Sequence, residues 1–184
     1  MNKNTRIKIR NRSTGTVIYN VLDLGVRREF TAGEIKEVSF EELQKLSYQP
    51  GGMYMLENYL VIENLEAREE LLGEVELEYD YTEDKVKEVL LYGSLDSLLD
   101  CLDFAPKGVI DIVKKVAVEM EITDTRKRKA IYNATGFNVD GAIKINEETK
   151  MTEEDAETPV RRVATTEAKK TESDVPVRRT VVKK

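Results

Sequence analysis

Carboxylates on one helix are the first side chains in this sequence that could do chemistry. Asp96, Asp100 and Asp103 are spaced so that they share one face of a helix, where three carboxylates could hold a hard cation. Leucines at four positions between 95 and 102 form the opposite stripe, which is typical of an amphipathic helix with a solvated acidic face. No Asp-x-Asp-x-Asp-Gly loop accompanies the carboxylates. We therefore favour the solvated face and predict no metal site.

Nucleophiles and phosphate-binding loops are the next candidates. The chain has no histidine, so Ser-His and Cys-His nucleophile systems and the commonest metal ligand are missing. The single cysteine, Cys101, allows no intrachain disulfide, and its neighbours are leucines and aspartates, which do not lower a thiol pKa. We expect Cys101 to be a buried core residue. Since no glycine-rich phosphate-binding motif occurs either, we predict a protein that is not an enzyme and has no cofactor.

Basic side chains gather in three places. Every second residue from Arg6 to Arg12 is basic, Arg27-Arg28 opens another predicted strand, and residues 126–129 read Arg-Lys-Arg-Lys within a predicted helix. Each group could contact phosphate. However, no stacking aromatic residues interleave the groups, and the chain has a net charge of -6. A solvated face or an acidic protein partner explains them equally well.

The C-terminal segment, residues 150–184, differs in composition from the rest. It contains no Leu, Ile, Phe, Tyr or Trp, so we expect it to be a flexible tail when free. It also repeats a Pro-Val-Arg-Arg motif, in which proline favours an extended backbone, valine offers an apolar anchor and paired arginines can bind carboxylates. We predict that both copies bind a partner, and a plain solubilising tail is the alternative. The predicted partner-binding residues are Pro159, Val160, Arg161, Arg162, Pro176, Val177, Arg178 and Arg179.

The whole chain has 184 residues, of which 40% are hydrophobic and 35% charged. This is enough for one core or two small ones. No apolar run near Met1 resembles a signal peptide, and nowhere do about 18 apolar residues occur together. We expect a soluble protein that is made in a reducing cytoplasm and has no membrane partner.

Residues 1–63 have the pattern of a small β domain. Alternating or β-branched runs predict strands over 5–10, 16–21, 27–30 and 34–38, with hairpin turns at 13–15 and 31–33. Ser39 and Glu42 form a capping-box pattern that predicts a helix, which Pro50-Gly51-Gly52 ends. Two further strands are predicted over 54–56 and 59–62.

Residues 64–149 have mostly helical patterns. A connector over 64–80 contains a helix over 65–72, capped by Asn64 and ended by Gly73, and an exposed strand or extended stretch over 74–79. Residues 81–149 are then predicted to form a helical bundle, which completes an α+β fold with the flexible tail. Its helices run from Thr82 to Gly93, from Ser94 to 102, from Pro106 to about 120, from Thr123 or Asp124 to Gly136, and from Asn138 to about Glu148. Its expected core includes Leu98, Leu99, Leu102, Phe104, Ile110, Val113 and Ile131.

Several of these segments resemble a known class of protein. Residues 11–19, 27–34, 40–43, 50–52 and 95–106 are similar to small accessory, virion-associated structural proteins of tailed bacteriophages of gut and Firmicutes hosts. The resemblance spans about residues 5–145, and it carries over no catalytic residue.

The resemblance implies a structural role in a phage particle, and the tail suits such a role. The predicted function is a non-enzymatic component of the virion, made in the host cytoplasm and bound to the capsid or to the neck and connector region. The tail would dock on neighbouring subunits in a symmetric multi-copy assembly. The alternative is a phage-encoded regulatory protein that acts on host transcription or nucleic acid through its basic groups.

Overall fold

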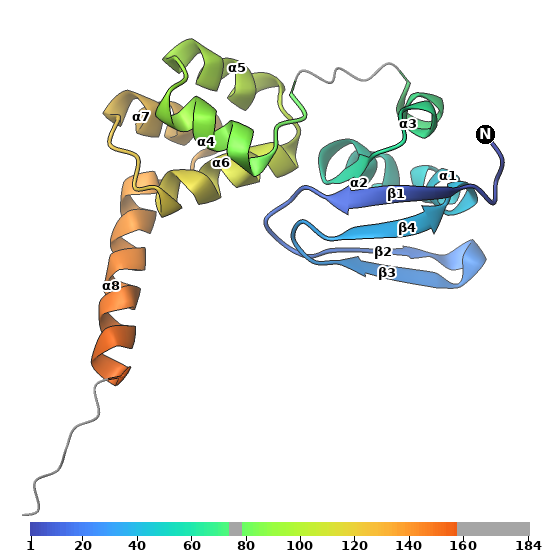
Figure 1. Ribbon diagram of the computed structural model, residues 1–184, viewed down its shortest axis with the longest axis horizontal. Coiled ribbons are helices and arrows are strands. Elements are labelled where there is room, and N and C mark those ends of the chain that lie inside the picture. The colour runs from blue at the N-terminus through green and yellow to red at the C-terminus, as the bar shows by residue number, and fades with distance from the viewer. Residues whose placement is uncertain (74–78, 158–184) are drawn as a thin grey trace, which may run out of the picture.

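The protein folds into two packed bodies, from which one long helix projects (Figure 1). In the computed structural model, residues 1–73 and 79–157 are described, with residues 151–157 described by their backbone alone. The expectations for 74–78 and for the repeats of the tail lie outside the described residues. Small antiparallel sheets followed by helices confirm the α+β class. Within the described residues, no helix is both long and apolar enough to cross a membrane.

The N-terminal body, residues 1–72, has one apolar core under two small sheets. Strand β1 lies in the middle of a three-stranded antiparallel sheet of order β4-β1-β5, where Ile7 is opposite Val38. Strands β2 and β3 form a separate antiparallel pair. The elements are β1 (Arg6–Asn11), β2 (Val17–Val21), η1 (Leu22–Leu24), β3 (Val26–Phe30), β4 (Ile35–Ser39), α1 (Phe40–Ser47), α2 (Gly52–Asn58), β5 (Leu60–Ile62) and α3 (Leu65–Leu72).

Both predicted hairpins are wrong, because residues 13–15 and 31–33 connect strands of different sheets. The hairpin that does form joins β2 to β3 through η1. The buried Asn11 side chain links the two connections between the sheets, at 13–15 and 31–33. Its Nδ2 donates to the carbonyls of Gly15 at 2.7 Å, Phe30 at 3.1 Å and Thr31 at 3.0 Å. One side chain thus satisfies carbonyls that a strand ladder leaves unpaired.

The predicted start of α1 at Ser39 is confirmed, but the capping box is incomplete. The Ser39 hydroxyl accepts from the backbone N–H of Glu42 at 3.3 Å. The Glu42 carboxylate is instead buried, where it accepts from the Tyr19 hydroxyl at 2.7 Å and from two Arg28 nitrogens at 3.0 Å. The carboxylate therefore ties α1 to the β2–β3 pair.

Residues 54–56, which were predicted to be a strand, lie in helix α2. Gly51 has a φ of 77° and turns the chain after α1. Gly52 then packs on α1 so closely that a Cβ would lie 1.7 Å from the carbonyl oxygen of Leu46. Because Gly52 packs against α1, the chain continues as a short helix and not as a strand. The predicted strand over 59–62 then follows as β5.

The helical body, residues 79–143, begins its helices at the predicted residues. The side chains of Thr82, Ser94, Asp124 and Asn138 each accept a hydrogen bond from the first turn of the following helix, and Pro106 directly precedes α6. Helix α8 runs past Glu148, where its end was expected. The helices are α4 (Glu83–Leu91), α5 (Leu95–Phe104), α6 (Lys107–Glu119), α7 (Thr125–Thr135) and α8 (Val139–Glu157).

Five of the seven expected core residues of this body are buried. The expectation is wrong for Leu99 and Phe104, which are 38% and 66% exposed. The buried stripe of α5 consists of Leu98, Cys101 and Leu102, so Leu99 points away from it. Phe104 is the last residue of α5, and its ring contacts that of Tyr79 at 5.8 Å between ring centres instead of entering the core.

Candidate functional site

The eight predicted partner-binding residues, Pro159 to Arg162 and Pro176 to Arg179, lie outside the described residues. Their role therefore stays a prediction. The structure does describe α8, the helix that leads to them. Only the first part of α8 packs on the body, through Val139 and Ile143, which are 2% and 8% exposed.

Beyond those residues, α8 leaves the body. Ile145 is already 65% exposed, and the helix points away from both bodies (Figure 1). Its 19 residues span about 28 Å at 1.5 Å per residue. The far end of α8 is thus the point from which the repeat segment continues.

Neither the carboxylates nor the thiol of α5 form a reactive site. Asp96, Asp100 and Asp103 are all exposed, and no group of metal-ligating side chains converges within residues 1–73 and 79–150. Cys101 is fully buried, as expected. Burial raises the pKa of its thiol to about 11, because the thiolate would be poorly solvated there.

The four basic residues of α7 do not share one face, because Lys127 is buried. Lys127 is 5% exposed, and its ammonium donates to the carbonyls of Val89 at 3.1 Å, Leu90 at 2.7 Å and Gly93 at 2.8 Å. It therefore caps the C-terminal end of α4, where helix carbonyls lack partners. Arg126 pairs with Asp124 and Arg128 with Asp140, which leaves Lys129 as the one member of this group with no partner among the described residues.

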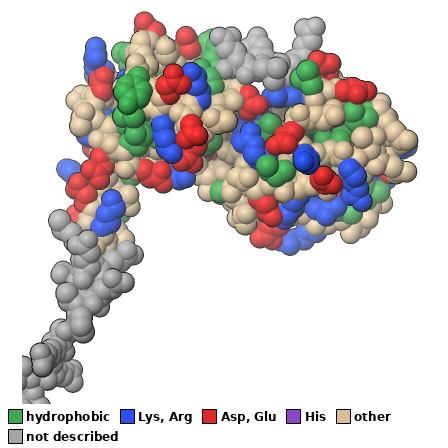
Figure 2. All heavy atoms as spheres, in the orientation of Figure 1, with side chains coloured by type: hydrophobic (Ala, Val, Ile, Leu, Met, Phe, Trp, Pro, Cys, Tyr) green, Lys and Arg blue, Asp and Glu red, His purple; other side chains and the backbone are tan. Residues whose placement is uncertain are grey.

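The basic residues of the N-terminal body are also divided among different roles. Arg28 pairs with buried Glu42, and Arg27 lies 3.4 Å from Glu29. Arg6 and Lys8 point to solvent from β1, but Arg12, expected on the same face, lies beyond the strand end and is buried. Basic and acidic side chains are intermixed over the face in Figure 2. This pattern is typical of a mixed, solvated surface.

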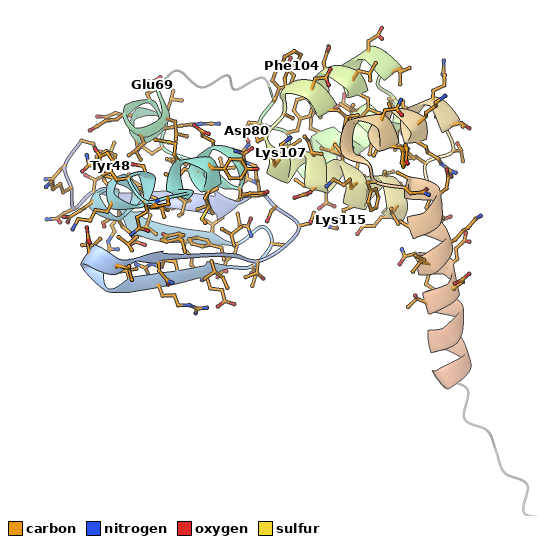
Figure 3. All side chains as sticks on the ribbon, turned by 180° about the vertical axis from the view of Figure 1, so that it is seen from behind. Tyr48, Glu69, Asp80, Phe104, Lys107 and Lys115 are labelled. Carbon is orange, nitrogen blue, oxygen red and sulfur yellow. The ribbon has the colours of Figure 1, made fainter. Side chains whose placement is uncertain are left out.

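Arg12 belongs to the junction between the two bodies, which sequence reasoning missed. The Asp80 carboxylate lies 3.4 Å from Arg12 Nη1 and 3.5 Å from Arg68 Nη1, so one carboxylate faces two buried guanidinium groups. The backbone N–H of Lys107 donates to Asn58 Oδ1 at 3.2 Å across the same junction. Figure 3 shows Asp80 and Lys107 where the bodies meet.

Gly108 allows this close approach. A Cβ at Gly108 would lie 2.6 Å from Arg12 Cγ and 2.9 Å from the carbonyl oxygen of Asn58. Glycine in the first turn of α6 was the sequence signal that could have pointed to the contact, because glycine is a poor helix former. Without a side chain there, the aliphatic part of Arg12 packs directly on the helix.

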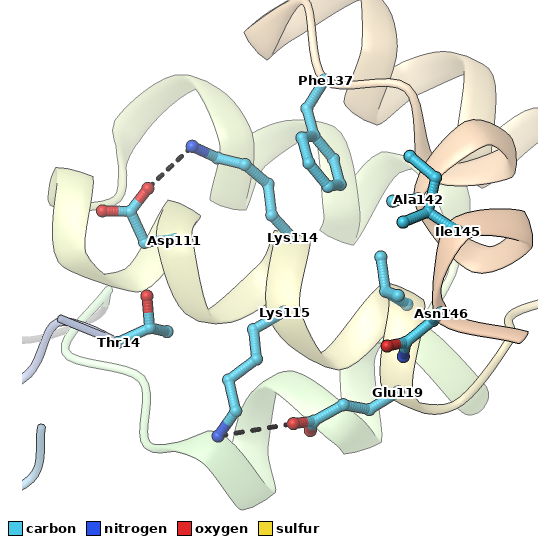
Figure 4. A pocket seen from close by; sticks show the side chains of 10 residues that line it. Thr14, Asp111, Lys114, Lys115, Glu119, Phe137, Ala142, Ile145 and Asn146 are labelled. Carbon is cyan, nitrogen blue, oxygen red and sulfur yellow. Dashed lines mark hydrogen bonds and ion pairs between the residues drawn. The ribbon is translucent and has the colours of Figure 1, made fainter. Parts of the chain in front are cut away.

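A hollow near this junction lies between α6 and α8 (Figure 4). It has a volume of about 520 Å³, and its apolar lining comes from Val118, Phe137, Ala142 and Ile145. The ion pairs Asp111–Lys114, at 2.7 Å, and Lys115–Glu119, at 3.7 Å, lie along its rim. With its cations and carboxylates paired to each other, this hollow can offer apolar contact but no free charge.

Comparisons with protein families, curated proteins and solved structures give no match for this chain.

Proposed function

We propose that the chain is a non-enzymatic structural component of a tailed-phage particle, associated with the capsid or with the neck and connector region. Its C-terminal segment docks on neighbouring subunits of a symmetric multi-copy assembly. The single structural observation that carries the docking role is the projection of α8 from the body (Figure 1).

A helix that projects from the body can contact a neighbouring subunit that lies some distance away. Ile143 is the last buried residue of α8 with a described side chain, and residues 144–150 are exposed, so packing on this chain contributes little to that part of the helix. An ion pair joins it to the body, from Lys150 to Glu121 at 3.9 Å. The part of α8 beyond Ile143, residues 144–157, is short enough that a helix of its length alone is marginal in water. Contacts with a neighbouring subunit would supply the missing packing, and they would bring the two Pro-Val-Arg-Arg repeats to that subunit.

The chemistry of the repeats fits an acidic protein surface. Residues 158–184 carry eight basic and three acidic side chains, and each repeat places two guanidinium groups next to a valine. Arginine binds carboxylates through two parallel hydrogen bonds, which gives direction as well as charge attraction. Two copies on one segment increase the effective concentration of the second contact once the first has formed.

The inward contacts of Lys127, Arg28 and Arg12 favour a protein partner over nucleic acid. Each of these cations is held within the chain and not presented to phosphate. The assignment to a phage particle rests on the resemblance of residues 5–145 to virion-associated proteins.

The first test is the composition of purified phage particles. Mass spectrometry should find the chain in the particles, in a copy number set by the symmetry of the assembly. Its absence from particles, together with binding of the isolated protein to duplex DNA at physiological salt, would favour the regulatory alternative and contradict the proposal.

The second test concerns the repeats. Changing Arg161, Arg162, Arg178 and Arg179 together to Ser should leave the fold intact and reduce incorporation of the protein into particles. The matched control changes Lys169, Lys170, Lys183 and Lys184 to Ser, which removes the same charge from the same segment outside the repeats. If the two variants are incorporated equally, the segment is attracted to the particle only by its overall positive charge. The proposal that the repeats dock on a subunit is then wrong.

A further inference from the structure

The outer face of α5 is exposed and combines apolar and acidic side chains. At about 100° per residue, Leu99 lies at one border of this face and Phe104 at the other, and three carboxylates lie between them. The stripe that packs in the core is on the opposite side of the helix. The α5 outer face consists of Asp96, Leu99, Asp100, Asp103 and Phe104, which are all exposed.

The three carboxylates of the α5 outer face have no partner among residues 1–73 and 79–150. None of them forms a hydrogen bond or an ion pair there. The lysines of α4 and α6 that form ion pairs do so with carboxylates of those two helices. Residues 74–78, which precede Tyr79, contain no lysine or arginine that could balance the carboxylates. The face therefore carries three negative charges that a basic partner can neutralise.

The Pro-Val-Arg-Arg repeat has the chemistry and the length to cover this face. Asp96 and Asp103 are about 10 Å apart along the helix axis, and four extended residues span about 10 to 13 Å. The two guanidinium groups of a repeat can form charge-assisted hydrogen bonds with the carboxylates. The valine can contact Leu99. The proline ring can pack on Phe104, whose ring centre lies 5.8 Å from that of Tyr79.

The first repeat, Pro159–Arg162, cannot reach the α5 outer face of its own chain. From Ile143 to Glu157, helix α8 extends about 21 Å beyond its last buried residue. Arg162 follows Glu157 after a stretch that spans at most about 18 Å when fully extended. Helix α5 lies on the side of the helical body opposite α8, as Figure 1 and the position of Phe104 in Figure 3 show. A first repeat bound to this face therefore comes from a second copy.

We propose that the α5 outer face binds the first Pro-Val-Arg-Arg repeat of a second copy of this chain. This inference rests on the docking role of the repeats proposed above, and it names the neighbouring subunit as the chain itself. The contact is head-to-tail, because α5 and the helix that leads to the repeats lie on opposite sides of the helical body (Figure 1). Head-to-tail contacts close into a ring when the rotation between copies allows it. A ring of copies is a symmetric assembly of the kind that the proposed function requires.

A peptide of residues 156–165 tests the binding directly. The receptor is the full chain without its own competing repeats, made by changing Arg161, Arg162, Arg178 and Arg179 to Ser. Fluorescence anisotropy should show that the labelled peptide binds this receptor and that binding weakens as sodium chloride is added. The same peptide with both of its arginines changed to Ser is the control, and equal binding of the two peptides would contradict the proposal.

Variants of the α5 outer face locate the binding site. Changing Asp96, Asp100 and Asp103 together to Asn should raise the Kd of the peptide about tenfold, because three carboxylates lose their charge. The matched control removes three exposed negative charges from the N-terminal body, by changing Glu57, Glu63 and Glu69 to Gln. It should leave the Kd unchanged. Equal effects of the two variants would mean that the peptide responds only to overall charge, and the proposal would be wrong.

Mixing two variants of the full chain shows which copy supplies the repeat. One variant carries the three Asp→Asn changes of α5, and the other carries the four Arg→Ser changes of the repeats. Sedimentation velocity should show that each variant alone is a monomer and that the mixture forms a one-to-one pair. The intact repeat of the first variant then binds the intact α5 outer face of the second. A mixture that stays monomeric would overturn the proposal.

The failure of this inference differs from the failure of the proposed function. If the mixture stays monomeric while the four Arg→Ser changes still reduce incorporation into particles, the repeats dock on a different subunit. If the mixture forms the pair but the chain is absent from particles, docking between copies is correct and the assignment to a phage particle is wrong.

Discussion

Lys127→Met is the substitution that best tests the account of the helical body. Methionine has nearly the length of lysine and fills the same space, so the change removes the ammonium with little loss of packing. The three carbonyls of Val89, Leu90 and Gly93 then lose a donor at 2.7 to 3.1 Å. Two of these hydrogen bonds are fully buried, so water does not replace the donor freely.

The expected loss follows from these contacts. A hydrogen bond to a charged group contributes about 1.5 to 3 kcal/mol net, and a cation at a helix C-terminus adds about 0.3 to 2 kcal/mol. The three contacts share one ammonium, whose own burial opposes them, so the terms do not add in full. We expect a decrease of about 2 to 5 kcal/mol in the free energy of unfolding of the helical body. For a body of this size the melting temperature should fall by roughly 8 °C or more.

Urea unfolding followed by far-UV circular dichroism measures this loss. Lys129→Met is the matched control, because Lys129 lies on the same helix but is exposed, and its substitution should change the free energy of unfolding by less than about 0.5 kcal/mol. A loss below about 1 kcal/mol for Lys127→Met would refute the reasoning, since it would mean that the carbonyls do not depend on the ammonium.

Three further predictions concern packing, the thiol and the C-terminal segment. Leu102→Ala should lower the free energy of unfolding by about 2 to 5 kcal/mol, and Leu99→Ala by less than about 1 kcal/mol, in the same urea assay; equal losses would contradict the assigned face of α5. The pKa of Cys101 is raised from 9.0 to about 11, so the stability contributed by its buried neutral thiol is present below pH 9 and is lost as the pH rises through about 11. A thiol reagent at pH 8 should therefore modify Cys101 only after unfolding, and rapid modification of the native chain would show that the residue is accessible. A chain ending at Glu157 should keep the cooperative unfolding of the full chain, and loss of cooperativity would place residues 158–184 in the core.

The helix starts were predictable because their causes are local. Ser39, Asn64, Thr82 and Ser94 each cap a helix through a side chain that reaches a backbone N–H three residues later. Such a contact depends on a few neighbouring residues, which the sequence displays directly. Which face of a helix is buried is harder to predict, as Leu99 shows, because it depends on where the neighbouring helices lie.

The strand pairing was not predictable in the same way. The turn residues at 13–15 and 31–33 suit a hairpin, but the buried Asn11 side chain stabilises a crossing between two sheets. The helix over 54–56 has a similar cause, because Gly52 packs against α1. In each case a contact with another part of the chain outweighs the local preference.

The candidate sites show the same division. Lys127 and Arg12 belong to basic groups that the sequence presents as possible phosphate contacts. In the structure Lys127 caps α4, and Arg12 is buried at the junction beside Asp80. Side-chain type alone shows what a residue can bind, whereas its neighbours in space decide what it does bind.

The α+β class, the helix caps, the burial of Cys101 and the repeated Pro-Val-Arg-Arg motif could all be read from the amino-acid sequence, since each depends on composition or on residues a few positions apart. The tertiary structure alone decided the order of the strands, the partners of the buried cations and the junction between the bodies. These features depend on residues far apart in the chain, such as Arg12 and Gly108, and only the packing of the two bodies brings them together.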